Sequence, residues 1–451
     1  MSEINDTICA VATGNNPGAI SVIRVSGKDA KEIVSKNFSR DLRNAESHKS
    51  YFGLFLWKGE PLDEVLITFF QTGKSYTGEE TVEIACHGSR YIQEKTLSIL
   101  VEAGCRLAEP GEFTKRAFIN GNLDLSQAEA VADLIASSSK ASHDLALRQL
   151  RGGLSNILKG LRDKLIHFAS LVELELDFSE EDVEFADRKD LIALVQNVLE
   201  YLEKTRNSFE LGNAIKEGVP VAIVGAPNTG KSTLLNQLLG EERAIVSDIA
   251  GTTRDVIEET INFGGMVFRL IDTAGIRESN DTIESIGIER SKQSIEKAKI
   301  VITLADASDA KSIMEVDRWV NELKETHKQK HILKVANKKD ISIGKISEQF
   351  NCISAKSGEG LEQLKEQLIS SIEEGYDMQN DIILTNLRHK EAIDKTIDSL
   401  SAAHNGLISD VSGDFVAMDI RQAMFYLGSI TGEISTDDLL GNIFANFCIG
   451  K

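Results

Sequence analysis

The chain is poor in the residues that stabilise small secreted proteins. It has 5 cysteines and 5 prolines among 451 residues, and no Cys-x-x-Cys pair occurs. An odd number of cysteines without such a pair argues against a disulfide framework and against a zinc site. No apolar run approaches the ~20 residues that span a membrane, and the acidic start lacks the pattern of a signal peptide. We therefore expect a cytoplasmic protein.

Basic residues are also scarce. The chain has 50 Lys and Arg against 70 Asp and Glu, which gives a formal net charge of −20. Because contacts with phosphate need Lys and Arg, this balance argues against a general nucleic-acid-binding protein. Residues 1–119 are near neutral, whereas residues 120–215 are acidic. Any contact with nucleic acid is therefore expected at a local basic surface outside the acidic stretch.

Hydrophobic patterning divides the chain into four segments. Residues 1–119 combine β-like runs such as Ile20–Val25 with helical stretches, which predicts an α+β domain. Residues 120–215 space leucines by three and four, which is typical of amphipathic helices that pack together. Residues 216–380 alternate strands and helices, which predicts an α/β domain with a mostly parallel sheet. The helical pattern returns over residues 381–451.

Helical segments on both sides of the α/β segment indicate an α/β domain inserted into a helical domain. Patterning alone leaves a second arrangement open, in which the two helical segments form separate domains. The predicted fold class is therefore multidomain, α/β and α.

A glycine-rich motif stands between the first strand and helix of the α/β segment. Gly225–Ser232 reads Gly-Ala-Pro-Asn-Thr-Gly-Lys-Ser, in the context that a phosphate-binding loop requires. Its glycines let backbone N–H groups converge on phosphate oxygens at the helix N-terminus. Lys231 is expected to reach the β- and γ-phosphates, and Ser232 to ligate Mg²⁺. The predicted nucleotide contacts of this loop are Asn228, Thr229, Gly230, Lys231, Ser232 and Thr233.

The segment Asp272-Thr273-Ala274-Gly275 follows the next predicted strand. Asp272 is placed to hold Mg²⁺ through water, and Gly275 to present its N–H to the γ-phosphate. Between this segment and the phosphate loop lies Gly251-Thr252-Thr253. A threonine here usually closes over Mg²⁺ when GTP is bound, and Thr253 is the predicted ligand.

A third motif, Asn337-Lys338-Lys339-Asp340, predicts recognition of guanine. Asp340 can accept hydrogen bonds from the N1 and N2 donors of guanine, a pair that adenine lacks. Ser354-Ala355-Lys356 follows the next strand and is expected to contact the guanine O6 through backbone N–H groups. Three motifs in this order predict a Ras-like G domain that binds and hydrolyses GTP.

One catalytic residue is missing from the usual set. Ras-like enzymes carry a glutamine after the second motif that orients the attacking water, and this chain has Ile276 there. An isoleucine cannot orient water, so another polar side chain or a cation must contribute. The nearby candidates are Arg277, Glu284 and Glu289.

These motifs, with others along the whole chain, resemble the MnmE (also called TrmE) family of tRNA-modifying GTPases. The resemblance rests on the segments at 18–27, 110–118, 123–130 and 248–255 and on the Phe-Cys-Ile-Gly-Lys end at 447–451, of which the N-terminal segments and the end are the most specific. The resemblance implies an N-terminal α+β domain that binds folate and dimerises, and a G domain inserted into a helical domain.

The resemblance also implies a potassium-stimulated GTPase whose G domains pair across their nucleotides as a homodimer. Asn228 matches the potassium ligand of the family, with carbonyls around Ser247, Ile249 and Thr252 completing the cage. A cation beside the phosphates supplies the charge that an arginine finger provides elsewhere. Glu284 matches the glutamate that orients water. The further nucleotide contacts implied are Asp248, Ala250, Gly251, Thr252, Thr273 and Ala274.

The N-terminal domain of the family binds a tetrahydrofolate derivative (the 5-formyl or 5,10-methylene form) as one-carbon donor. Arg24, Glu83 and Lys451 fall on its folate-contacting positions. Arg24 is expected to pair with the folate glutamate carboxylate, and Glu83 to accept from the pterin. Another member has a lysine where this chain has Asn122, which can form hydrogen bonds but carries no charge.

Cys448 belongs to the Cys-x-Gly-Lys ending of the family. A thiol near a one-carbon donor suggests a nucleophilic role, and a buried cysteine at a helix end is the alternative. In the family, the protein acts with a flavoprotein that carries FAD, MnmG (also called GidA). The pair installs an aminomethyl or carboxymethylaminomethyl group at carbon 5 of the wobble uridine of certain tRNAs.

Two other functions compete with a tRNA-modifying enzyme. One is a regulatory GTPase that assists ribosome or RNA assembly without chemistry of its own. The other is a self-assembling structural GTPase, which the lack of a long coiled coil or membrane segment disfavours. Binding of tetrahydrofolate is the observation that separates the first two.

Overall fold

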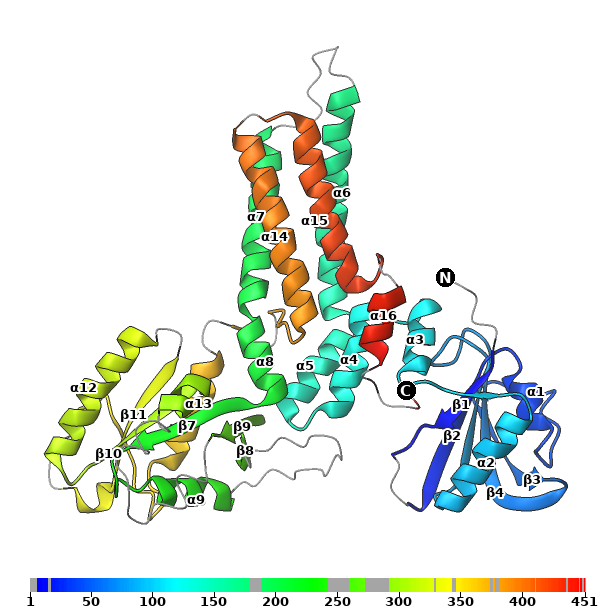
Figure 1. Ribbon diagram of the computed structural model, residues 1–451, viewed down its shortest axis with the longest axis horizontal. Coiled ribbons are helices and arrows are strands. Elements are labelled where there is room, and N and C mark those ends of the chain that lie inside the picture. Colours follow the sequence, from blue (N-terminus) through cyan, green and yellow to red (C-terminus); the bar gives the residue numbers. More distant parts are fainter. Residues whose placement is uncertain are drawn as a thin grey trace. The chain divides into compact units, whose positions relative to one another are not determined.

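The computed structural model (Figure 1) describes most of the chain, namely residues 6–14, 18–177, 188–241, 259–271, 292–327, 330–342, 346–373, 376–377, 381–409, 411–434, 437–445, 447 and 450. These residues belong to two compact units. The first consists of residues 1–135, 147–195 and 398–451, and the second of residues 136–146 and 196–397. Each unit has its own six-stranded sheet.

The first unit contains all strands that precede residue 110 and most of the helices outside the α/β segment. Its elements are β1 (Ile8–Val11), β2 (Ile20–Ser26), α1 (Ala30–Ser35), β3 (Lys49–Trp57), β4 (Glu60–Phe70), β5 (Thr81–His87), α2 (Arg90–Glu102), β6 (Arg106–Leu107), α3 (Glu112–Ile119), α4 (Leu125–Ala136), α6 (Gly153–Asp177), α15 (Gly413–Thr431) and α16 (Asp437–Phe444).

The second unit contains the remaining strands. Its elements are α8 (Phe209–Glu217), β7 (Val219–Gly225), α9 (Lys231–Glu241), β8 (Glu259–Phe263), β9 (Met266–Leu270), β10 (Ile300–Asp306), α12 (Ala310–Thr326), β11 (His331–Asn337), the 3₁₀ turn η2 (Lys339–Ile341), β12 (Asn351–Cys352) and α13 (Leu361–Glu373). Three further helices belong partly to each unit: α5 (Lys140–Leu150), α7 (Arg188–Asn207) and α14 (Leu387–Ile408).

The sheet of the first unit has the strand order β3-β4-β5-β2-β1-β6. Its pairs are antiparallel except β1 with β6. Ile23 and Val25 of β2 and Ile84 of β5 are buried in a core that α1 and α2 cover (Figure 1). Because side chains alternate along a strand, the neighbouring Arg24 and Glu83 lie on the opposite face of the sheet.

The sheet of the second unit has the order β12-β11-β10-β7-β9-β8 and is parallel except for the β8–β9 pair. The register pairs Gly225 of β7 with Leu304 of β10, and Asn337 of β11 with Asp306 of β10. Gly225 and Asn337 therefore end their strands at the same edge of the sheet, where doubly wound α/β folds bind their ligands.

Helical segments from before and after the α/β segment contact each other within both units. In the first unit, α6 packs along α15, and the Arg188 side chain donates a hydrogen bond to the Leu407 carbonyl over 2.8 Å. In the second, the Leu384 N–H donates to the Ser208 hydroxyl over 3.0 Å. Such contacts are what an inserted α/β domain requires.

The mixture of an α+β sheet, a mostly parallel α/β sheet and long helices confirms the predicted fold class. The boundaries predicted after residues 119, 215 and 380 stay predictions. Within the described part of the chain, no helix has both the length and the apolar character needed to cross a membrane.

Candidate functional site

The glycine-rich motif forms a turn between β7 and α9. Asn228 and Gly230 have left-handed backbones, with φ of 62° and 95°. A Cβ atom at residue 230 would overlap the side-chain amide of Asn337, so the close approach of these two segments requires glycine there. The turn thereby directs backbone N–H groups toward the start of α9, as phosphate binding demands.

Lys231 is the first residue of α9, and its side chain folds back over the turn. Its Nζ donates hydrogen bonds to the carbonyls of Gly225, over 2.8 Å, and Ala226, over 2.9 Å. Burial lowers the pKa of the Lys231 ammonium. A partly desolvated ammonium held at the turn before α9 fits the triphosphate and Mg²⁺ that the motif predicts.

Asn337 connects the phosphate turn with the segment that follows β12. Its side-chain Nδ2 donates to the Thr229 carbonyl over 2.9 Å, and its Oδ1 accepts from the Ala355 N–H over 2.8 Å. The side chain is buried, and each of its two polar atoms has a partner in a different segment. One residue thus holds the turn expected to bind phosphate beside the segment expected to bind the base.

Asp340 lies beside this junction, in the 3₁₀ turn η2. Its Oδ1 accepts a hydrogen bond from the Ser354 hydroxyl over 2.7 Å. Lys338, which precedes the turn, has a φ of 67° and pairs with Asp306 over 2.6 Å. Burial works to raise the pKa of the Asp306 carboxyl, but the bond from Lys338 holds it below its usual range. Lys356 is exposed at the rim of the junction.

The structure therefore brings together the predicted nucleotide contacts that it describes: Asn228, Thr229, Gly230, Lys231, Ser232, Thr233, Asn337, Lys338, Asp340, Ser354, Ala355 and Lys356. Other predicted residues lie outside the described part of the chain: Ser247, Asp248, Ile249, Ala250, Gly251, Thr252, Thr253, Asp272, Thr273, Ala274, Gly275, Glu284, Cys448 and Lys451.

Arg24 and Glu83, the two predicted folate contacts in the first unit, face each other on β2 and β5. The Nε and Nη2 atoms of Arg24 lie 3.0 and 2.9 Å from Oε1 of Glu83. The guanidinium carbon also lies over the rings of Tyr76 and Phe113, 5.4 and 5.6 Å from their centroids. Arg24 thus pairs with Glu83 in the described structure, and its pairing with a folate carboxylate, which the resemblance implies, stays a prediction.

The side chain of Asn122 forms hydrogen bonds with the backbone of a neighbouring segment. Its Nδ2 donates to the carbonyls of Ser75, over 3.0 Å, and Tyr76, over 3.1 Å. The segment 71–80, between β4 and β5, is therefore fastened to the turn that follows α3. The position occupied by a lysine in another family member supports the chain's own structure here.

The C-terminal tail returns to the first sheet. Gly450 has a φ of 96° and lies so close to the Val11 carbonyl that a Cβ atom would overlap it. Phe447 packs against Gly111 and forms an edge contact with Phe444, with ring centroids 5.3 Å apart. These contacts anchor the tail on both sides of Cys448 against the domain that holds Arg24 and Glu83.

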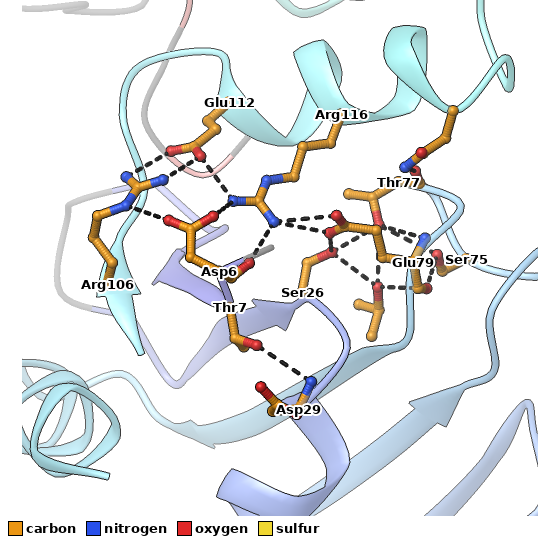
Figure 2. Close-up of polar contacts among 12 residues, drawn as sticks. Asp6, Thr7, Ser26, Asp29, Ser75, Thr77, Glu79, Arg106, Glu112 and Arg116 are labelled. Carbon is orange, nitrogen blue, oxygen red and sulfur yellow. Dashed lines mark hydrogen bonds and ion pairs between the residues drawn. The ribbon is translucent and has the colours of Figure 1, made fainter. Parts of the chain in front are cut away.

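Sequence reasoning missed a buried ion network beside these residues (Figure 2). Arg116, only 1% exposed, donates to the Asp6 carboxylate over 2.7 Å, to Glu79 over 3.1 Å and to Glu112 over 3.0 Å. Arg106 also binds Asp6 and Glu112. The only signal in the sequence was the spacing of Glu112 and Arg116, four residues apart on one helix.

The network sets the charge of its carboxylates. Burial works to raise the pKa of both Asp6 and Glu112, but the bonds from Arg106 and the nearby Arg116 hold the pKa of each below its usual range. Both carboxylates are thus kept ionised against their burial.

Comparison with known proteins agrees with this geometry. Residues 125–448 match the family described as the MnmE helical domain, and residues 7–122 match the N-terminus of the GTP-binding protein TrmE. The chain belongs to the MnmE family. This membership confirms the resemblance inferred from the sequence and makes the α/β segment the G domain of a GTPase.

Curated MnmE relatives match the chain from end to end. The tRNA modification GTPase MnmE of Christiangramia forsetii is 50% identical over 476 residues and covers 100% of both chains. The protein of the same name from Flavobacterium johnsoniae is 50% identical over 462 residues, with 99% of each chain covered. That of Cytophaga hutchinsonii is 50% identical over 458 residues, covering 100% of this chain and 99% of its own.

Proposed function

We propose that this protein hydrolyses GTP to GDP and phosphate in a potassium-dependent reaction that drives modification of tRNA. It acts in the cytoplasm as a homodimer, with a flavoprotein of the MnmG (GidA) kind that carries FAD. The pair adds an aminomethyl or carboxymethylaminomethyl group to carbon 5 of the wobble uridine. The observation that carries the nucleotide part is the double contact of Asn337 with Thr229 and Ala355. End-to-end relatives named tRNA modification GTPases support the tRNA part.

In this proposal the chain's own groups bind and orient the nucleotide. Lys231 exchanges its two carbonyl partners for oxygens of the β- and γ-phosphates, and Ser232 ligates Mg²⁺ together with Thr253. Asp340 accepts from the guanine base while Ser354 fixes the orientation of its carboxylate. ATP binds weakly because adenine leaves this carboxylate without its donors.

Asn228 holds the potassium ion. Its side chain is exposed at a left-handed turn next to the start of α9, and it forms no hydrogen bond within the described residues. An amide oxygen at such a turn suits a monovalent cation beside the phosphates. The bound cation offsets the charge that develops on the bridging oxygen. Glu284 orients the attacking water in place of the glutamine that Ile276 replaces.

Glu83 and Arg24 form part of the site for the one-carbon donor, a tetrahydrofolate derivative. The Arg24 guanidinium donates to Oε1 of Glu83. Among the described residues, no donor forms a hydrogen bond with Oε2. A carboxylate with one oxygen held by Arg24 and the other unused can accept a hydrogen bond from an N–H donor of a pterin. Cys448 and Lys451 complete this site from the tail that Gly450 anchors.

Mass spectrometry of wobble nucleosides tests the proposal as a whole. Cells that lack the protein are expected to lose the modified uridine, and the wild-type protein is expected to restore it. The Lys231→Ala and Glu83→Gln variants should fail to restore it for separate reasons: the first lacks GTP hydrolysis, and the second lacks the one-carbon donor. A normal nucleoside profile in the deletion strain would refute the proposal and favour a role in ribosome or RNA assembly.

A further inference from the structure

The segment 71–80 between β4 and β5 is fastened to α3 and to the turn after it. The side chain of Asn120 donates to the Thr77 carbonyl over 2.7 Å. The Tyr76 hydroxyl lies 2.9 Å from the hydroxyl of Thr114, and Glu79 pairs with the buried Arg116 (Figure 2). These contacts join the segment to α3 through both its side chains and its carbonyls.

Asn122 adds the two contacts nearest to Tyr76. An amide group has two N–H donors, and the Nδ2 atom of Asn122 reaches the carbonyls of both Ser75 and Tyr76. With both directions used, Asn122 has no donor left for a ligand. Its oxygen remains, but the nitrogen serves to hold the backbone at residue 76.

The ring of Tyr76 in turn restricts Arg24. The guanidinium carbon lies 5.4 Å from the centroid of this ring and 5.6 Å from the centroid of Phe113, on α3. Contacts of a cation with aromatic faces add to the ion pair with Glu83. Burial raises the pKa of the Tyr76 hydroxyl, so the ring stays neutral beside the cation. Together with the ion pair to Oε1 of Glu83, these ring contacts hold the guanidinium in place.

We propose that Tyr76 is a positioning residue of the one-carbon donor site, and that Asn122 holds it over Arg24. This inference rests on the proposed function of the Arg24–Glu83 pair. Tyr76 keeps the guanidinium on Oε1, which leaves Oε2 of Glu83 directed at the pterin. Asn122 itself carries no charge, and it contributes to the site by holding the backbone of Tyr76.

Binding of 5-formyltetrahydrofolate to the full-length protein, measured by calorimetry, tests the inference. Tyr76→Leu removes the aromatic face and is expected to raise the Kd about three- to thirty-fold. Tyr76→Phe keeps the ring and should restore nearly all of the affinity. Tyr91→Leu is the matched control, because Tyr91 is 63% exposed on α2, over the other face of the sheet. It should leave the Kd unchanged.

A double-mutant cycle separates positioning from general support of the fold. If Tyr76 acts through the Arg24–Glu83 pair, Tyr76→Leu should add almost nothing to the loss already caused by Glu83→Gln. Additive losses would overturn the inference. If Tyr76→Leu fails to fold, Asn122→Ala provides the second test, because Asn122 is exposed and its removal leaves the ring in place but unheld. We expect it to raise the Kd about two- to ten-fold.

The outcomes also distinguish the inference from the function on which it rests. A wild-type protein that binds no 5-formyltetrahydrofolate overturns both. A wild-type protein that binds it, together with Tyr76→Leu and Asn122→Ala variants that bind equally well, overturns only the positioning role and leaves the one-carbon site in place.

Discussion

Around the phosphate turn the predicted ligand contacts belong mainly to the main chain, whereas at the Arg24–Glu83 pair they belong to side chains. Gly230 matters because it lacks a side chain, and Asn337 is buried because it holds carbonyl and N–H groups of other segments. Arg24 matters through its guanidinium, which Glu83 and two aromatic rings fix in place.

The two constructions respond differently to substitution. A main-chain site depends on local backbone conformation, so one substitution in the turn disturbs every N–H group that it presents. A side-chain site depends on partners from strands that are distant in the sequence, so one substitution removes one contact and leaves the others in place. The predictions below use this difference, and the first includes a measurement at the other site.

Lys231→Ala should have the largest effect. The ammonium is the cation of the chain that lies on the phosphate turn, and its removal should lower GTP turnover about 10²- to 10³-fold. Phosphate release at saturating GTP gives the measurement. Binding of 5-formyltetrahydrofolate should be unchanged, and a parallel loss of both activities would refute the independence of the two sites.

Asn228→Ala should remove the response of the GTPase to potassium. The wild-type protein is expected to hydrolyse GTP about tenfold or more faster in KCl than in NaCl, because only K⁺ fits beside the phosphates. The variant should hydrolyse GTP at the same slow rate in both salts. Asn236→Ala, an exposed change in α9 away from the predicted nucleotide contacts, is the control and should keep the difference. Equal wild-type rates in the two salts would reject the cation site.

The sequence revealed the main-chain site far better than the side-chain site. The first strand of the α/β segment is observed as β7 (Val219–Gly225), and the turn after it contains Asn228 and Gly230 with left-handed backbones. Such requirements are local, because the phosphate contacts come from consecutive residues. A motif can therefore encode them completely.

The partners of Arg24 lie too far along the chain for any motif to show. Glu83 is separated from it by 59 residues and meets it only through the register of β2 and β5.

In residues 120–215 the sequence pattern does not show where one helix ends and the next begins. Their leucine spacing runs on without interruption, but Gly152, with a φ of 84°, separates α5 from α6. Strand β3 (Lys49–Trp57) is hard to find from the sequence, because the exposed Phe52 breaks the alternation of apolar and polar residues.

Gly230→Ala tests how strictly the turn depends on its backbone. A methyl group at a φ of 95° is strained and would displace the Asn337 amide, which should cost about 1–3 kcal/mol of stability and weaken GTP binding. Gly240→Ala is the matched control, because a Cβ atom there meets nothing within 4 Å and α9 is helical. The control should stabilise the protein by about 0.5–1 kcal/mol. Urea denaturation and GTP titration measure both, and equal stability of the two variants would contradict this account of the turn.

Arg106→Gln should have the smallest effect, and one that depends on pH. The folded-state pKa of Asp6 and of Glu112 lies below the ordinary values of 3.8 and 4.5, so their pairing stabilises the fold above those values and is lost as pH falls through the lowered ones. At pH 7 the variant should lose about 1 kcal/mol, a figure already reduced for the exposure of Arg106. The difference from wild type should shrink below pH 4 as both carboxylates take up protons. Arg90→Gln, which breaks an exposed pair with Glu94 on α2, is the control. It should leave the stability unchanged both at pH 7 and below pH 4. Urea midpoints between pH 3 and 7 provide the measurement, and a pH-independent loss would show that Arg106 acts by packing and not by its charge.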